Sequence, residues 1–502
     1  MSTLFDAIRA GDEDGAVRAL RGGADPEGVE DGETALYRAA VGNEPGIVRV
    51  LLAAGADPGR AAEDPGGLPL CGAACGGHAE VVRALLAGGA AVDQEEAYGF
   101  TALAWAVGLG HAGTVRALLE HGADPDRPGP DGVVPLVAAA RRGSTASVRA
   151  LLDHGAAARE AALREARRWI GVDVAAELRR GLVAGNDGGQ TYEAVVRRVR
   201  EDGGVTVVVE LLREDGAPAR GDERQTGHAA IATVLEAELG LRTSHEELAA
   251  RALRCGDPEL DAWTTAVDVL AGRADEETFV AATTWCAYRD PLRQALGARV
   301  LGALPGFGPS AVPVLRRTVS GAAGAPAGVP ADGRTGGGSG REPVLSGVIA
   351  LGACGDGEAV PELLASAGHP DAAVRRAAAQ ALAGIVPPGH VEALGVLLAL
   401  SRDGDARVRD WATLALAELP DDTPLVREGL AERLGDDDPE TAAEAARGLA
   451  IRQDPRAVQA LAAILADGDP EGAARETALA AIEHIRDARV RSRLEWTSPR
   501  CR

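Results

Sequence analysis

The chain has 502 residues, too many for one hydrophobic core, and its 46% hydrophobic and 25% charged residues are ordinary for a soluble protein of two or three domains. Its formal net charge of −23 repels a phosphate backbone, and Arg scattered among excess Asp and Glu cannot form a continuous basic stripe, which excludes nucleic acid as the expected partner. The acidic start lacks a signal peptide and no apolar run is long enough to span a bilayer, so we expect a cytoplasmic protein without membrane attachment.

The hydrophobic residues are mainly Ala, Leu and Val, and aromatic residues make up only 3%, which favours thin layers of small helices. All 52 basic residues are Arg, and with the abundant Ala, Gly, Asp and Pro this indicates the coding bias of a GC-rich, bacterial genome. The six cysteines are scattered and form no CxxC pair. Even Cys71 and Cys75, four apart on a predicted helix, lack the further ligands that zinc needs, so we expect neither disulfides nor a metal or other cofactor.

A Leu-Leu pair recurs along the first third of the chain with spacings of 34, 33 and 33 residues, each time followed by a Gly-Ala turn. A fixed period of that length indicates a stack of similar supersecondary units, each contacting only its neighbours. Such a stack presents an elongated recognition surface. The four pairs are Leu51-Leu52, Leu85-Leu86, Leu118-Leu119 and Leu151-Leu152.

The repeating units resemble ankyrin repeats, with the pattern G-x-T-P-L-H-x-A-A-x-x-G-H-x-x-x-V-x-x-L-L-x-x-G-A-D. One of them reads GFTALAWAVGLGHAGTVRALLEHGADPD, and the others match at similar density. The resemblance implies two helices per unit, with Thr34 and Thr101 bonding the turns that open first helices. LFDAIRAGDEDGAVRALRGGADP keeps the pattern but is polar, so we predict a capping repeat followed by four repeats over residues 1–157.

In the ankyrin family a partner binds the loop tips and the exposed face of the first helices. The resemblance therefore implies these contact candidates: Glu30, Asp31, Glu33, Asp64, Tyr98, Phe100, Leu109, Asp131, Arg141 and Arg142. Tyr98 and Phe100, close to Trp105, concentrate aromatic residues in a chain that has few, as suits an interface anchor. Residues 1–157 hold 22 acidic and 12 basic side chains, a net of −10, which favours a partner patch with Arg or Lys. The alternative is a solvated acidic surface that keeps the array soluble.

The period is absent from residues 158–255, where we predict a small α+β module. TYEAVVRRVR and GVTVVVELLR flank a Glu-Asp-Gly-Gly turn and predict a β-hairpin at about 191–213, the only strands that we expect. A polar loop follows, and His228 opens a helix close in sequence to Asp222 and Glu223. This is the nearest approach to a chemical constellation, although a His near a helix start more often bonds backbone or a neighbouring carboxylate.

A second repeat occupies residues 256–496. Segments such as HPDAAVRRAAAQALAGI and GDARVRDWATLALAEL start with a capping residue and run into an Ala/Leu helix, with Leu382, Leu416, Leu449 and Ile482 spaced by 34, 33 and 33. These segments resemble HEAT or HEAT-like repeats. In that family an Asp at the start of a first helix and an Arg a few residues on often form a ladder between repeats, and Asp371 with Arg375 and Asp405 with Arg409 match that spacing. The repeat that starts at Pro439 lacks the Arg, so we expect the ladder to break there. We predict a disordered Gly/Ala/Pro-rich insertion at about 320–341 and a tail at 497–502.

The predicted fold is therefore mostly α, with two α-solenoids, an ankyrin array and a HEAT-like array, joined by a small α+β module that contains a β-hairpin. The leading interpretation is a non-catalytic scaffold or adaptor that binds one or more proteins through their basic or apolar patches. The alternatives are an enzyme or ligand-binding protein with its site in the central module near His228, and a HEAT protein similar to bilin lyases. No Cys/Tyr/Asp cluster supports the last alternative.

Overall fold

The computed structural model describes residues 3–63, 66–184, 192–323, 341–467, 469 and 472–497. These residues form 28 α-helices, a short 3₁₀ helix and two small antiparallel sheets, which confirms the predicted, mostly α fold. The chain divides into two compact units, Met1–Ala266 and Val267–Arg502.

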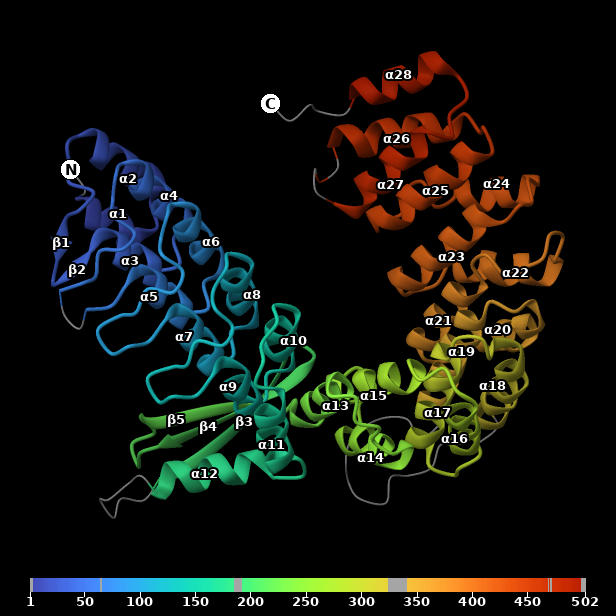
Figure 1. Cartoon of the computed structure of the whole chain (residues 1–502). Coiled ribbons are helices and arrows are strands. Elements are labelled where there is room, and N and C mark those ends of the chain that lie inside the picture. Colours follow the sequence, from blue (N-terminus) through green and yellow to red (C-terminus); the bar gives the residue numbers. More distant parts are fainter. Residues whose placement is uncertain are drawn as a thin grey trace. The chain divides into compact units, whose positions relative to one another are not determined.

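Five helix pairs stack along the N-terminal part of the first unit (Figure 1). The first helix of each pair has seven or eight residues and the second has nine. The pairs are α1 (Leu4–Ala10) with α2 (Glu13–Arg21), α3 (Ala35–Val41) with α4 (Pro45–Ala53), α5 (Pro69–Cys75) with α6 (Ala79–Ala87), α7 (Ala102–Leu109) with α8 (Ala112–Glu120), and α9 (Pro135–Arg142) with α10 (Thr145–Asp153).

Small side chains set the spacing of this stack. The Ala pairs of the first helices, Ala39-Ala40, Ala73-Ala74 and Ala139-Ala140, are fully buried, and so is the first Leu of each Leu-Leu pair. Thr34 and Thr101 cap α3 and α7 by accepting backbone N–H bonds, as predicted.

Each first helix separates two ends of its repeat. The tip loops precede the first helices, and one of them forms the short hairpin of β1 (Val29–Glu30) and β2 (Glu33–Thr34). The helix-helix turns follow the first helices. Because a helix of eight residues is about 12 Å long, the tip loops and the turns form opposite edges of the array.

A three-stranded sheet follows the array, with β3 (Glu193–Glu201), β4 (Gly204–Leu212) and β5 (Pro218–Gln225) in antiparallel order β3-β4-β5. The predicted hairpin is confirmed as β3 and β4. The expectation that it holds the only strands was wrong, because β5 occupies the predicted polar loop and β1 pairs with β2. The sequence of β5, PARGDERQ, lacks apolar alternation, and its pairing with the Val-rich β4 makes it a strand.

Five helices surround the sheet or follow it: α11 (Arg159–Trp169), α12 (Val174–Ala184), α13 (His228–Glu238), α14 (His245–Cys255) and α15 (Asp261–Ala271). Val174 and Leu178 of α12 pack against Val207 and Val209 of β4 in a small core. The larger core of the array continues through α11 and α13. The array and the sheet module are therefore packed as one unit.

A buried ion pair joins α13 to α14. Both carboxylate oxygens of Glu236 in α13 accept from the guanidinium of Arg251 in α14, at 2.7 and 3.0 Å. Arg167 of α11 and the Thr243 hydroxyl also donate to Glu236. These donors outweigh desolvation and hold the pKa of the Glu236 carboxyl below its ordinary value.

The second unit consists of stacked helices. They are α16 (Glu276–Cys286), α17 (Pro291–Ala303), α18 (Gly308–Ala323), α19 (Arg341–Cys354), η1 (Gly357–Ala359), α20 (Val360–Ser366), α21 (Ala372–Leu382), α22 (Val391–Leu400), α23 (Ala406–Glu418), α24 (Pro424–Ala431), α25 (Pro439–Ile451), α26 (Arg456–Asp467), α27 (Ala473–Ile482) and α28 (Ala488–Thr497). The long helices α17, α19, α21, α23, α25 and α27 pack in succession. Most of the insertion predicted at about 320–341 lies outside the described residues, between α18 and α19.

An arginine ladder links successive repeats of this unit. Its ion pairs are Arg341 with Asp371 at 3.0 Å, Arg375 with Asp403 at 2.7 Å, and Arg409 with Asp436 at 2.8 Å. Each Arg thus reaches an Asp that precedes the next long helix, while Asp371 and Asp405 cap α21 and α23. The position 34 residues after Arg409 is Ala443, so the ladder ends at α25, as predicted.

Arg452 performs a different task at the end of α25. Its guanidinium donates to the carbonyl oxygens of Leu416, Ala417 and Leu419 at the end of α23, at 3.1, 2.9 and 2.6 Å. The side chain is only 6% exposed, and burial lowers its pKa. It satisfies carbonyl groups that the helix itself leaves unpaired.

We predict that Arg452→Ala lowers the free energy of unfolding of the second unit by about 2–4 kcal/mol, because several buried carbonyl groups lose their donors. Calorimetry of the full chain measures this loss. Arg407→Ala, an exposed arginine on α23, is the matched control, with an effect within about 0.5 kcal/mol. Equal effects of the two substitutions would contradict the capping role.

Candidate protein-interaction surface

The structure places the predicted contact residues at two opposite edges of the N-terminal array. The tip loops carry Glu30, Asp31, Glu33, Tyr98, Phe100 and Asp131. Leu109, Arg141 and Arg142 end first helices and lie at the edge of the helix-helix turns. Asp64 lies outside the described residues.

The acidic tip of the first loop is partly neutralised by Arg38. This guanidinium forms ion pairs with Glu30 at 3.2 Å and Glu33 at 2.9 Å, and Glu30 also pairs with Arg9. Asp31 is at the turn with φ 51° and its side chain is 83% exposed, with Arg38 at 3.9 Å. Asp31 therefore offers the most accessible carboxylate of this loop.

Tyr98 stands on the aromatic part of the tip-loop edge. It is 66% exposed, whereas the nearby Phe100 ring stacks on Trp105 with 4.4 Å between ring centroids. The indole Nε1–H of Trp105 donates to Glu96 at 2.8 Å, which fixes this pair. In the next loop Asp131 is exposed and accepts the N–H of Val133. An exposed tyrosine in the same loop as a fixed aromatic pair is a candidate interface anchor.

At the turn after α9 the opposite edge is bound to the chain's own sheet module. Arg142 is only 10% exposed, and it forms an ion pair with Glu223 of β5. Arg224 donates to the carbonyl oxygen of Arg141 at 3.0 Å, and the N–H of Gly227 donates to that of Gly143 at 3.0 Å. Sequence reasoning missed this contact, since no sequence pattern links α9 to β5.

His228 lies inside this contact and is not accessible. The side chain is 2% exposed, its ring stacks on Trp169 with 5.3 Å between centroids, and its Nε2 lies 3.3 Å from the carbonyl oxygen of Arg141. Burial lowers its pKa to about 4, so the imidazole is neutral at pH 7. Arg224 covers the Trp169 ring at 4.0 Å. This arrangement is that of a packed core histidine.

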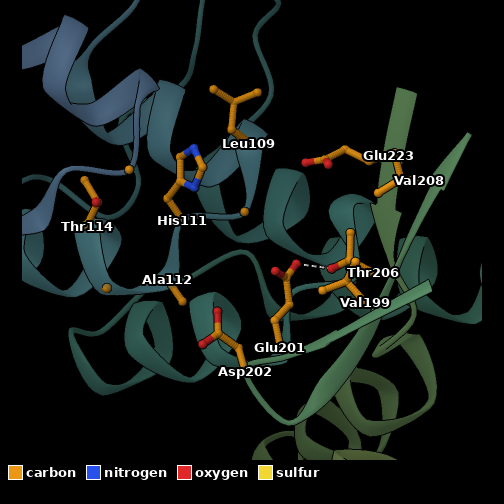
Figure 2. A pocket seen from close by; sticks show the side chains of 13 residues that line it. Leu109, His111, Ala112, Thr114, Val199, Glu201, Asp202, Thr206, Val208 and Glu223 are labelled. Atoms are coloured by element: carbon orange, nitrogen blue, oxygen red, sulfur yellow. Dashed lines mark hydrogen bonds between the residues drawn. The ribbon is translucent and has the colours of Figure 1, made fainter. Parts of the chain in front are cut away.

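A crevice of about 250 Å³ lies between the sheet and the turn edge of the array (Figure 2). Leu109 and His111 line it from the array, and Val199, Glu201 and Asp202 line it from β3 and its turn. The Thr206 hydroxyl donates to the Glu201 carboxylate. The sequence predicted the turn at 201–204, but not that the turn faces an ankyrin-like helix end.

The described residues contain no set of side chains arranged to bind a metal ion. Across the described ranges, no group of three or more His, Cys, Asp or Glu residues could hold a metal ion. Cys71 is a buried free thiol, and burial raises its pKa to about 12. Within those same ranges no helix has the length and apolar character needed to cross a membrane.

Family comparisons agree with the two helix arrays. A family model described as ankyrin repeats (3 copies) matches residues 59–128, one for a single ankyrin repeat matches residues 31–62, and one described as HEAT repeats matches residues 346–417 and 427–496. The chain carries ankyrin repeats followed by HEAT repeats. Both kinds of repeat are typical protein-interaction modules. No curated protein matches the chain.

The ankyrin-like helix pairs α1–α2 and α9–α10 lie outside the matched ranges, as does the sheet module. They extend the ankyrin stack at both ends. The contact of the ankyrin array with β5 thus involves a part of the chain that no family model covers.

We predict that the first unit becomes less stable as pH falls from about 6.5 to 4. In this range the unfolded chain binds a proton at His228 and the folded chain does not, so folding loses up to about 3 kcal/mol. Urea denaturation at about pH 7.5, 5.5 and 4.5 measures the loss. His228→Gln removes this part of the pH dependence, whereas an unchanged dependence would show that His228 titrates normally in the folded chain.

Proposed function

We propose that the protein is a non-catalytic scaffold that binds a partner protein at the tip-loop edge of its ankyrin repeats. The observation that supports this most directly is the difference between the two edges. The turn after α9 is bound to β5 and to the start of α13. Tyr98, two residues before Phe100 of the fixed Phe100–Trp105 pair, stays 66% exposed. Tyrosine is enriched among residues that contribute most to binding.

The charge of this surface favours a partner patch with both apolar and basic groups. Asp31 and Asp131 are exposed on their tip loops, and residues 1–157 carry a net charge of −10, with 22 acidic and 12 basic side chains. Complementary charge speeds association and rejects acidic partners. The net charge of −23 for the whole chain favours a protein over a nucleic acid as this partner.

The HEAT repeats give the scaffold a second surface, for which we propose a separate protein partner. We further propose that the protein acts in the cytoplasm, since the five described cysteines are free thiols, which suits a reducing compartment.

We predict that Tyr98→Ala reduces capture of the tip-loop partner from a cell extract by about tenfold, the size expected for truncating an interface anchor. Affinity purification with mass spectrometry measures this. Tyr288→Ala, at an exposed tyrosine of the second unit, is the control and leaves capture of the tip-loop partner unchanged.

His228→Gln at about pH 7.5 provides the opposite comparison, because at that pH the wild-type imidazole is neutral as well. If this variant lost the captured proteins and Tyr98→Ala kept them, the site would lie in the central module and the tip-loop proposal would fail.

A further inference from the structure

The strand β3 has an open edge. It is the outer strand of the order β3-β4-β5, and its nine residues pair with β4 alone. Most of its side chains are exposed, including Val199 at 47%. Among the described residues no backbone group of β3 bonds to another segment on its outer side. Such an edge is a template for an added strand.

The register shows which backbone groups are available. The turn between β3 and β4 has two residues with positive φ, Asp202 and Gly203, so the flanking pair Glu201–Gly204 is a hydrogen-bonded one. From this pair on, hydrogen-bonded and non-hydrogen-bonded residue pairs alternate along the two strands. The N–H of Thr226 donates to the carbonyl oxygen of Val205 on the β5 side of β4, which agrees with this alternation. The outward N–H and C=O groups therefore belong to Ala194, Val196, Arg198 and Arg200.

Paired arginines lie along the open edge of β3, and two carboxylates lie at its end. Arg197, on the face of β3 toward the crevice, is paired with Glu210 at 2.8 Å. Arg200, on the other face, is paired with Asp257. At the end of β3 the carboxylates of Glu201 and Asp202 line the crevice beside Val199, and the Glu201 carboxylate accepts the Thr206 hydroxyl (Figure 2). The crevice end of the open edge is thus acidic with an apolar side wall.

We propose that β3 binds an extended segment of a partner protein as a fourth strand, with an Arg or Lys side chain of that segment in the crevice. A residue placed opposite Val199 or Glu201 lies about 5 Å away on the same face. Its aliphatic stem packs on Val199, and its cationic head meets Glu201 and Asp202. A second copy of β3 fits less well, because Arg197, its arginine on that face, is already paired.

This surface is separate from the tip loops, so the two proposals fail independently. The probe is an acetylated, fluorescently labelled peptide Thr-Val-Thr-Arg-Thr-Val-Thr, which presents Val, Arg and Val on one face. The control peptide has the same sequence with Glu in place of Arg. Fluorescence polarisation with the full chain is expected to show about tenfold tighter binding of the Arg peptide.

Val196→Pro removes one outward N–H and leaves the pairing with β4 intact, so it is expected to weaken binding about tenfold. Val196→Thr keeps that N–H and preserves binding. Glu201→Gln with Asp202→Asn is expected to abolish the preference for the Arg peptide, and this variant tests the proposal even if Val196→Pro disturbs the fold. Tyr98→Ala leaves binding unchanged.

Equal binding of the two peptides, no binding by the wild-type chain, or full binding by a folded Val196→Pro variant would overturn the proposal. A dimer in light scattering that Val196→Pro converts to a monomer would assign the edge to a second copy and overturn it as well.

Discussion

The close approach of Gly143 and Gly227 is the contact on which the arrangement of the first unit depends. A Cβ on Gly143 would lie 2.2 Å from the carbonyl oxygen of Gln225, and a Cβ on Gly227 would lie 2.2 Å from Oγ1 of Thr145. With glycine at both positions the backbones meet at 3.0 Å. Arg142 then reaches Glu223, and His228 is enclosed. A turn glycine of a repeat thereby becomes a docking point.

This contact gives the two edges of the ankyrin array different roles. The turns after α7 and α9 pack against the sheet module, while the tip loops with Tyr98 and Asp31 remain exposed. Docking through β5 also leaves β3 at the outer side of the sheet. The array thus positions a second recognition element, whose open backbone groups differ in kind from the side-chain surface of the tip loops.

The parts of the fold that could be predicted from sequence are those with a local period. Helix pairs, capping threonines and the arginine ladder follow from residues within one or two repeats. The strand β5 could not be predicted, because its polar sequence becomes a strand through pairing with β4. The docking of Gly143 on Gly227 could not be predicted either, because the two residues are 84 positions apart and no repeat pattern relates them. The buried role of Arg452 could not be predicted because nothing in the sequence distinguishes this residue from the many exposed arginines. The family pattern predicts Leu109 and Arg142 as partner contacts, but in the structure both residues face the chain's own sheet module.

Amide hydrogen exchange of the full chain with Gly143→Ala tests the docking contact most directly. Gly122→Ala is the matched control, since Gly122 has a similar φ of +87° against +81° but no atom within 4 Å of an added Cβ. Our account predicts faster exchange in β3, β4, β5 and the start of α13 for Gly143→Ala alone, with α3 to α6 unchanged. Equal exchange in both variants, or a uniform increase over the array, would contradict it.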